Sequence, residues 1–419
     1  MIWPVRRVPR GPYASIAAVP TSDLRVTVVG VGADGWDGLT PAARAVVNSA
    51  DVVLGGPRQL ALLPAAAGQV RQPWPSPLSA ALPELLTQFA GQMVVALASG
   101  DPMLSGIGTT LVDILGADRV TVVPYLSSVT LARSRLGWSA ESTAVVSVVG
   151  RDVHAALREL APGHRVLVLS SDEKTPAALA ELLVARGYGA SRFVVLGDLG
   201  GDRETIAEST AQGFSGNSPR LNIIALQLKG PLLTGWASGL TDDAFEHDGQ
   251  LTKRDLRAAA LARLLPAPGQ LLWDIGAGAG SVGIEWMRAH PTCRAVAVEA
   301  DPQRAERITR NARSLGVPAL HVVCGTAPES LSDLATPDAV FIGGGASRPG
   351  VLQRCVDALS AGGRIVVHGV TVETEAVLAA AYAEHGGELT RIHVEHAAPV
   401  GSFTGWTPAR AVTQWAFTK

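Results

Sequence analysis

The sequence has few cysteines, and their spacing excludes two kinds of stabilised fold. Only three occur in 419 residues, and Cys293, Cys324 and Cys355 form no CxxC pair. Small secreted domains are held by closely spaced disulfides, and many structural zinc sites use CxxC ligands. We therefore expect a reduced, cytoplasmic protein with no disulfide framework and no metal site.

Excess charge and long apolar runs are also missing. Lys and Arg together number 35 and Asp and Glu 37, so the formal net charge is −2. Without a basic run, the charge pattern indicates no nucleic-acid partner. No apolar run reaches the ~18 residues of a membrane-spanning helix, so we expect no membrane contact. Residues 1–24 carry Arg6, Arg7 and Arg10 but lack the continuous apolar core of a signal peptide, and we interpret them as a flexible leader.

Apolar residues are abundant at 47%, and the length suits two domains. Residues 25–228 alternate between strand-like and helix-like segments, which indicates an α/β domain of the parallel type. Thr40 and Pro41 predict the start of a helix over 41–48, Gly187 ends one over 176–186, and 64–82 is interpreted as a surface connection. The expected strands are 25–29, 50–54, 92–98, 119–123, 165–169, 192–196 and 221–228.

Periodicity is lost over 229–240, which contains three glycines and a proline, so we place a domain linker there. The second domain, 241–419, begins with a helix through Leu265 for which Thr252 and Asp255 predict a capping box. About seven strands follow, and the last two are expected to pair antiparallel because no helix separates them. The expected strands are 271–275, 294–299, 319–323, 338–342, 364–368, 389–396 and 411–418.

Two glycine-rich turns each follow an apolar run that is typical of a buried strand. In the second, Gly278-Ala-Gly280-Ser-Val-Gly283 fits G-x-G-x-x-G, a pattern that alone also fits a dinucleotide site. Asp274 ends the preceding strand, where its carboxylate is placed to hold a ligand ammonium. Glu299 ends the next strand, where it is placed to take two ribose hydroxyls. These acids favour S-adenosylmethionine over the alternatives, a two-domain NAD(P)-linked oxidoreductase or a tight turn with no ligand.

The second half resembles the class I methyltransferase fold in Asp274-Ile-Gly-Ala-Gly-Ala-Gly280, Glu299, Gly325-Thr-Ala-Pro-Glu329 and Asp338-Ala-Val-Phe-Ile-Gly-Gly-Gly345. Segments 240–257 and 362–374 are similar to the decarboxylating precorrin methyltransferases, and the match covers nearly all of 240–419. The resemblance implies a Rossmann-like domain of about seven strands that binds S-adenosylmethionine. The implied cofactor-binding residues are Thr252, Asp274, Gly276, Ala277, Gly278, Ala279, Gly280, Glu299 and Ala327.

The first glycine turn, Gly30-Val-Gly32-Ala-Asp-Gly35, also fits G-x-G-x-x-G. We expect residues 36–39 to delay the next helix until Pro41, and a phosphate site needs a helix that starts at the turn. The segment Ser99-Gly-Asp-Pro102 is more informative, although by itself it also fits a β-turn. With Val123-Pro-Tyr-Leu-Ser-Ser-Val129 it resembles the tetrapyrrole methylase family over about 25–230. The implied cofactor-binding residues are Ser99, Gly100, Asp101, Leu104, Ser127 and Ser128.

The order of the two halves resembles the fused decarboxylating C5,15-methyltransferases of cobalamin biosynthesis. The resemblance implies one S-adenosylmethionine per domain and a precorrin substrate. It assigns methylation of ring carbon 5 to the first domain, and methylation of carbon 15 with loss of carbon dioxide from the ring-C acetate to the second. A pair of enzymes acting on a cobalt-containing ring and a non-catalytic tetrapyrrole carrier remain alternatives. Related methylases associate, so a homo-oligomer is expected.

Some residues are candidates for a role in the reaction itself. A substrate rich in carboxylates needs Arg or Lys around its site, and the candidates are Lys253, Arg254 and Arg348, with Arg133 or Arg135 in the first half. Decarboxylation needs a proton source, for which His247 and His368 are candidates because histidine titrates near neutral pH. Lys253 is a further catalytic candidate. We expect segment 242–252 to close over the cofactor.

Overall fold

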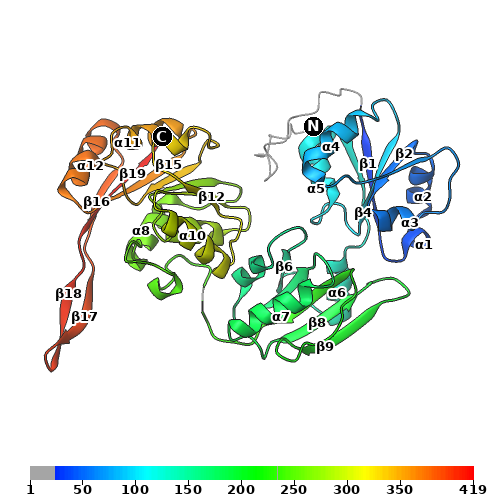
Figure 1. Ribbon diagram of the computed structural model, residues 1–419, viewed down its shortest axis with the longest axis horizontal. Helices are drawn as coiled ribbons and strands as arrows, with labels where there is room; N and C mark the ends of the chain where they lie inside the picture. Colours follow the sequence, from blue (N-terminus) through cyan, green and yellow to red (C-terminus); the bar gives the residue numbers. More distant parts are fainter. Residues whose placement is uncertain (1–23, 234) are drawn as a thin grey trace. The chain divides into compact units, whose positions relative to one another are not determined.

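The computed structural model describes residues 24–233 and 235–419, which form two compact units (Figure 1). The first unit comprises the chain up to Val153 and Pro162–Pro231, and the second comprises His154–Ala161 and Leu232–Lys419. The last of the three points at which the chain changes unit, between Pro231 and Leu232, lies inside the segment interpreted as a linker, and the other two enclose 154–161 within the expected first domain. The predicted leader, apart from Leu24, lies outside the described residues.

The first unit contains an all-parallel sheet in the order β3-β2-β4-β1-β5. Thr40 caps α2 as predicted, because its hydroxyl accepts a hydrogen bond from the Ala43 amide at 3.2 Å. The predicted surface connection over 64–82 is wrong, since it contains β3 and the start of α4. The elements are β1 (Val26–Val31), α1 (Gly35–Gly38), α2 (Pro41–Asn48), β2 (Val52–Gly55), α3 (Pro57–Ala61), β3 (Val70–Pro73), α4 (Leu78–Thr87), β4 (Val94–Ser99), α5 (Ile107–Leu115) and β5 (Val120–Val123).

A second sheet of the first unit has the order β6-β7-β10-β8-β9, and only β6 and β7 pair parallel. The prediction of a parallel arrangement is therefore wrong for this sheet, because β8 and β9 form a hairpin and β10 runs against both of its neighbours. Strands β6 and β9 were missed, since most of their residues are exposed or only partly buried. The elements are α6 (Ser128–Leu136), β6 (Thr143–Ser147), β7 (Arg165–Leu169), α7 (Thr175–Ala185), β8 (Arg192–Gly197), β9 (Thr205–Thr210) and β10 (Asn222–Gln227).

The second unit is built on seven strands in the order β13-β12-β11-β14-β15-β19-β16, which confirms the predicted number. The sheet is parallel except for β19, and the predicted antiparallel edge pair is β19 with β16. The elements are α8 (Arg254–Leu264), β11 (Leu271–Ile275), α9 (Ser281–Ala289), β12 (Arg294–Glu299), α10 (Pro302–Ser314), β13 (His321–Cys324), β14 (Ala339–Ile342), α11 (Val351–Ala358), β15 (Arg364–Gly369), α12 (Val372–His385), β16 (Glu388–Ile392) and β19 (Val412–Thr418).

Two details of the second unit correct the prediction. Helix α8 begins at Arg254 after Lys253, which makes no side-chain cap, so the capping box of Thr252 and Asp255 does not form. The strand expected over 389–396 is two strands, because β16 ends at Ile392. Strand β17 (Glu395–Val400) then pairs with β18 (Phe403–Pro408) in a separate hairpin that extends away from the sheet (Figure 1, red).

Apolar clusters on both faces of the seven-stranded sheet hold it between helices. Trp286 of α9 packs in the cluster that includes Phe341 of β14, and Trp273 and Trp415 lie in the cluster covered by α11 and α12. Strands buried on both faces are typical of parallel sheets, and their carboxyl ends meet at one edge. Among the described helices, none is long and apolar enough to cross a membrane.

Candidate functional site

In the second unit, the glycine turn Gly276–Gly280 leaves the carboxyl end of β11 and leads into α9. Gly276, Gly278 and Gly280 have φ of +65°, +60° and +76°, a region that residues with a side chain rarely adopt. A Cβ on Gly276 would lie 2.8 Å from the Gly344 carbonyl oxygen, and one on Gly278 would lie 2.7 Å from the Gln250 carbonyl oxygen. Loops from two other parts of the unit therefore lie directly against the turn.

Glu299, at the carboxyl end of β12, connects this turn to the next strand. One carboxylate oxygen accepts a hydrogen bond from the Gly278 amide at 2.8 Å, and the other accepts one from the Asp301 amide at 3.0 Å. The side chain is buried. A carboxylate oxygen can accept more than one hydrogen bond, so the predicted role toward ribose hydroxyls is compatible with this arrangement and stays a prediction.

Asp274 is only 1% exposed, and its two carboxylate oxygens differ. Oδ2 accepts a hydrogen bond from the Gly283 amide at 2.9 Å, whereas Oδ1 has no partner in the described part of the chain. Burial, with a smaller contribution from the nearby charge of Glu299, raises the pKa of this carboxyl to about 7 against the opposing effect of the Gly283 hydrogen bond. A buried acceptor without a partner is costly unless a ligand or water supplies a donor. Oδ1 is therefore the atom of Asp274 that is placed to accept a hydrogen bond from a cationic ligand group.

The entry segment, residues 240–252, is held at both ends by Arg257 of α8. This fully buried guanidinium donates to the Thr252 carbonyl at 2.5 Å, to the Leu240 carbonyl and to the Glu285 carboxylate at 2.5 Å. Its Nη1 also lies 3.4 Å from Asp242. One side chain thus fixes the points at which the segment leaves and rejoins the unit.

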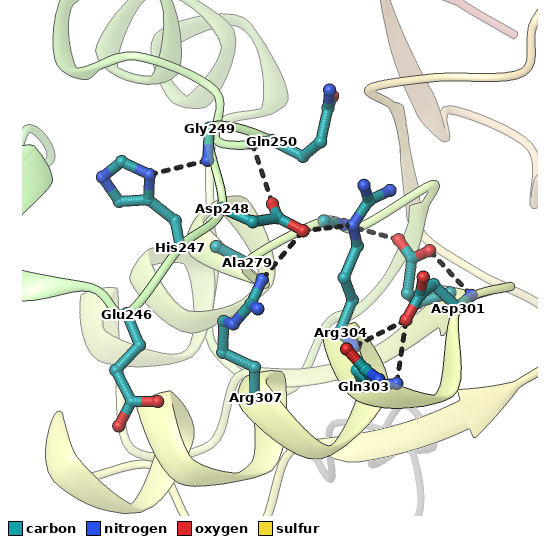
Figure 2. A network of polar contacts seen from close by, with 12 residues as sticks. Glu246, His247, Asp248, Gly249, Gln250, Ala279, Asp301, Gln303, Arg304 and Arg307 are labelled. Atoms are coloured by element: carbon teal, nitrogen blue, oxygen red, sulfur yellow. Dashed lines mark hydrogen bonds and ion pairs between the residues drawn. The ribbon is translucent and has the colours of Figure 1, made fainter.

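The middle of the entry segment is held against α10 by charged pairs (Figure 2). The Asp248 carboxylate accepts a hydrogen bond from Arg304 Nε at 2.8 Å and lies 3.1 Å from Arg307 Nη1. These contacts hold the pKa of Asp248 far below its usual range. Glu246 lies 3.0 Å from Arg310. With the Gln250 carbonyl against the glycine turn, the segment already lies over that turn, and its predicted closing movement stays a prediction.

The predicted catalytic residues of the second unit occupy different environments. His247 is exposed, its Nδ1 accepts a hydrogen bond from the Gly249 amide at 3.1 Å, and Figure 2 shows the ring on the side of the segment away from Arg304. His368 is buried, and its Nε2 lies 2.9 Å from the side-chain amide of Gln414. Its ring packs edge-on against Phe341. Burial lowers the pKa of His368 to about 4, so its ring is neutral at pH 7 and a poor proton donor.

The predicted cationic residues are at the surface. Lys253 lies 3.6 Å from the Asp242 carboxylate, and Arg254 and Arg348 are exposed. Among the first-unit candidates, Arg135 is already paired with Glu204 at 2.6 Å, which leaves it less available to a substrate. The roles of these residues toward a substrate stay predictions.

In the first unit, the predicted residues gather at the carboxyl ends of β4 and β5, on either side of β1. The Gly100 amide donates to the Val31 carbonyl at 2.9 Å, and a Cβ on Gly30 would collide with the Gly100 carbonyl oxygen. Ser127 caps α6 by accepting from the Thr130 amide at 3.0 Å, and Ser128 begins that helix. The two segments quoted for the family resemblance therefore meet at one sheet edge.

Two of the predicted first-unit residues also have local structural roles. The Asp101 carboxylate accepts a hydrogen bond from the Met103 amide at 2.9 Å, as the β-turn alternative anticipates, and Leu104 packs against the apolar cluster of the second sheet. One expectation is wrong: a one-turn helix, α1, follows Asp34 directly, so the helical turn is not delayed until Pro41. These contacts leave the cofactor roles of Asp101 and Leu104 untested.

Sequence reasoning missed three polar side chains at this edge. Arg58 and Gln59 of α3 both donate to the Ser99 hydroxyl, at 2.9 and 3.1 Å, so Ser99 keeps its own proton free to donate. The Tyr125 hydroxyl donates to Asp34, and burial together with this carboxylate raises the pKa of Tyr125 to about 12. The only sequence signal for Arg58 is its place after Gly-Gly-Pro at the end of a strand.

Comparison with known proteins assigns both halves to described families. The model for tetrapyrrole (corrin/porphyrin) methylases matches residues 25–214, and the model for a precorrin methyltransferase domain matches residues 243–419. A protein from Sinorhizobium sp. named precorrin-6Y C(5,15)-methyltransferase [decarboxylating] is 46% identical over 398 residues, covering 94% of this chain and 96% of its own. A Mycobacterium tuberculosis protein of the same name is also 46% identical and covered completely, with 94% of this chain aligned.

Among solved structures, the C-terminal domain of precorrin-6Y C5,15-methyltransferase from Rhodobacter capsulatus is 43% identical. It covers 44% of this chain and 100% of its own length, with a TM-score of 0.43.

Proposed function

The chain belongs to the precorrin-6Y C(5,15)-methyltransferase (decarboxylating) family, and from this premise we propose that it methylates carbons 5 and 15 of a precorrin-6 macrocycle. The same reaction sequence removes the ring-C acetate carboxyl as carbon dioxide and gives precorrin-8, a step of cobalamin biosynthesis. The similarity over 94% of the chain carries this proposal, because it spans both units and not one fold alone. The same similarity favours methyl transfer over the oxidoreductase alternative.

The two reactions are divided between the units. The first unit, matched by the tetrapyrrole methylase model, methylates carbon 5, and the second methylates carbon 15 and releases carbon dioxide. Each unit binds one S-adenosylmethionine at its glycine turn. Supporting this count, each turn lies at the carboxyl end of parallel strands, the place where open α/β sheets bind ligands.

S-Adenosylmethionine supplies an electrophilic methyl group on a sulfonium, and the electron-rich ring carbon of the substrate is the nucleophile. The protein therefore needs no nucleophilic side chain, and its contribution is to orient the two reactants and exclude water. In the second unit, Asp274 Oδ1 is placed for the donor's ammonium and Glu299 for its ribose. In the first unit, the Ser99 hydroxyl has its proton free to donate a hydrogen bond to S-adenosylmethionine.

The proton needed after loss of carbon dioxide has two candidate sources in the second unit. His247 is exposed to solvent, whereas the buried His368 is neutral at pH 7. We favour His247 as the acid, with Lys253 as the second candidate, and we assign His368 to holding Gln414 of β19 beside β15. Replacing His247 with Gln should slow release of carbon dioxide more than His368→Gln does.

The number of donor sites and the division of labour can be tested with matched glycine variants of the full chain. Calorimetry should find two S-adenosylmethionine sites in the wild type and one in each of Gly30→Val and Gly278→Ala, with no competition by NADPH. Mass spectrometry should find two added methyl groups and one lost carbon dioxide with the wild type, and no loss of carbon dioxide with Gly278→Ala. One site in a folded wild type, or an unchanged macrocycle mass, would refute the proposal.

We also propose that the protein is a homo-oligomer joined through the hairpin β17–β18. Val400, Phe403 and Trp406 on this hairpin are 58%, 79% and 72% exposed. An isolated two-stranded hairpin is marginally stable in water, so a second copy covering it would stabilise both. Light scattering should find an oligomer for the wild type and a monomer for the double variant Phe403→Ser, Trp406→Ser, and an unchanged mass would contradict this assignment.

A further inference from the structure

A cavity of about 510 Å³ lies between α12 and the edge strands β16 and β19 of the second unit, away from the glycine turn. Ala376, Ala379 and Leu389 form apolar parts of its wall. Glu375, Arg391 and Thr413 supply polar groups. None of these residues was a candidate from the sequence.

The strand register places this cavity at the edge of the sheet where ligands bind. Gly369, at the end of β15, pairs with Thr413, which in turn pairs with Arg391 near the end of β16. Strands β15 and β16 run in the same direction as β11, so their carboxyl ends share an edge with the glycine turn. From β11, which leads into the glycine turn, to β16 is four strand spacings, about 19 Å, a distance that a macrocycle with extended acidic arms can cross.

The cation of the cavity is the Arg391 guanidinium, and one side of it is already paired with the Glu375 carboxylate. Arg391 Nη2 lies 2.5 Å from one Glu375 oxygen, and the Thr413 hydroxyl donates to the other at 3.1 Å. Nε and Nη2 of Arg391 reach the same hydroxyl at 3.3 to 3.4 Å. In the described part of the chain Nη1 makes no hydrogen bond, and the side chain is 52% exposed. Glu375 thus holds the guanidinium in place and leaves one edge of it open.

We propose that this cavity receives a carboxylate-bearing arm of the macrocycle, distant from the reacting ring, and that Arg391 is the residue that binds its carboxylate. The proposal rests on the proposed function of the second unit. A planar guanidinium matches a carboxylate with two parallel hydrogen bonds, and the apolar wall accommodates the methylene groups of the arm. Glu375 competes with the arm for Arg391, so it sets the affinity as well as the geometry.

Steady-state release of carbon dioxide by the full chain tests this inference, because that step reports the second unit alone. A charge-assisted hydrogen bond of about 1.5 to 3 kcal/mol corresponds to roughly a tenfold to hundredfold rise in KM for the macrocycle in Arg391→Gln. The affinity for S-adenosylmethionine should not change. Glu375→Gln should lower KM, because it removes the competing carboxylate. Arg354→Gln, an exposed arginine on α11 outside the cavity, is the matched control and should leave KM unchanged.

The outcomes separate this inference from the proposed function. A wild type that releases no carbon dioxide from a precorrin refutes the function itself. A wild type that does so, with KM unchanged in Arg391→Gln or raised equally in Arg354→Gln, overturns the assignment of Arg391. A rise in KM for Glu375→Gln as large as for Arg391→Gln would also overturn it, because the pair would then serve only to hold β16 against α12.

Discussion

Arg257 allows the strongest quantitative prediction for the second unit. It is fully buried, lies 2.5 Å from the Glu285 carboxylate, and also donates to the carbonyls of Leu240 and Thr252. Breaking a buried pair from one side costs about 3 to 5 kcal/mol, because the remaining charge is left without a partner. Glu285 would keep the amides of Gly239 and Leu240 as donors, at 2.6 and 3.0 Å, so Arg257→Met should lose about 3 kcal/mol, the lower end of that range.

The cysteines provide an assay for this unit alone. All three lie in the second unit, and Cys355 is fully buried while Cys324 is exposed. Labelling of Cys355 by a thiol reagent across a urea series therefore follows unfolding of the second unit whether or not the first unit unfolds. The Cys324 signal gives the rate for an accessible thiol.

The control for Arg257→Met is an ion pair of the same unit that faces solvent. Arg310 and Glu246 are 53% and 58% exposed in their side chains, so Arg310→Met should lose less than about 1 kcal/mol. Adding Glu285→Gln to Arg257→Met should recover part of the loss, because it removes the unpaired charge. Equal, small losses for Arg257→Met and Arg310→Met would refute the view that this buried guanidinium holds the entry segment.

Three further predictions concern titration, the first-unit donor site and the entry segment. Burial keeps Asp274 protonated and His368 neutral in the native state between about pH 4 and 6.5. In this range Asp274 binds more protons when the protein is folded, so its contribution to stability falls as the pH rises. His368 binds more protons when the protein is unfolded, so its contribution to stability rises with the pH. The two contributions offset one another in the wild type. The urea midpoint of the second unit should therefore increase with pH in Asp274→Asn, where only His368 contributes, and decrease with pH in His368→Gln. Parallel plots of midpoint against pH for the two variants would contradict this. Arg58→Met should weaken S-adenosylmethionine binding by the first unit up to about tenfold, measured by calorimetry, because the Ser99 hydroxyl loses a charged partner. Asp248→Asn should speed amide hydrogen exchange in the entry segment and reduce its dependence on salt, because, of the ion pairs described between the segment and α10, only Glu246–Arg310 remains. Wild-type exchange rates in the variant would show that the Asp248 ion pairs do not hold the segment.

The sequence predicted most of the fold where strands are buried on both faces. The apolar runs of β11, β12 and β14 cannot face solvent on either side, so their place in a parallel sheet follows from composition alone. The hairpin β17–β18 could not be found this way. Its residues alternate between small, aromatic and polar types on two exposed faces, and no burial pattern marks them as strands.

The candidate sites were predictable to a similar extent. Glycines at positive φ and acids at strand ends leave a signal in the sequence, so the residues around Gly278 and Gly100 were anticipated. Arg58 leaves only its place after Gly-Gly-Pro at a strand end, and the contacts of Tyr125 and Arg391 leave no signal. Each of the three acts through contacts with residues distant in sequence. Arg391 lies 22 positions from Thr413, and only the register of β16 against β19 brings them together.

The two proposed donor sites differ in charge, and this difference should separate their responses to pH. In the second unit, a cationic donor beside Asp274 must displace a proton below about pH 7, because burial favours the neutral carboxyl, so its affinity falls as the pH decreases. In the first unit, the hydroxyls of Ser99 and Ser127 at the corresponding strand ends do not titrate in this range, and the Asp101 carboxylate beside them already accepts a hydrogen bond from the Met103 amide. Acidification therefore weakens the second site before the first. The order in which the two methyl groups are added would then depend on pH even with one macrocycle and one donor.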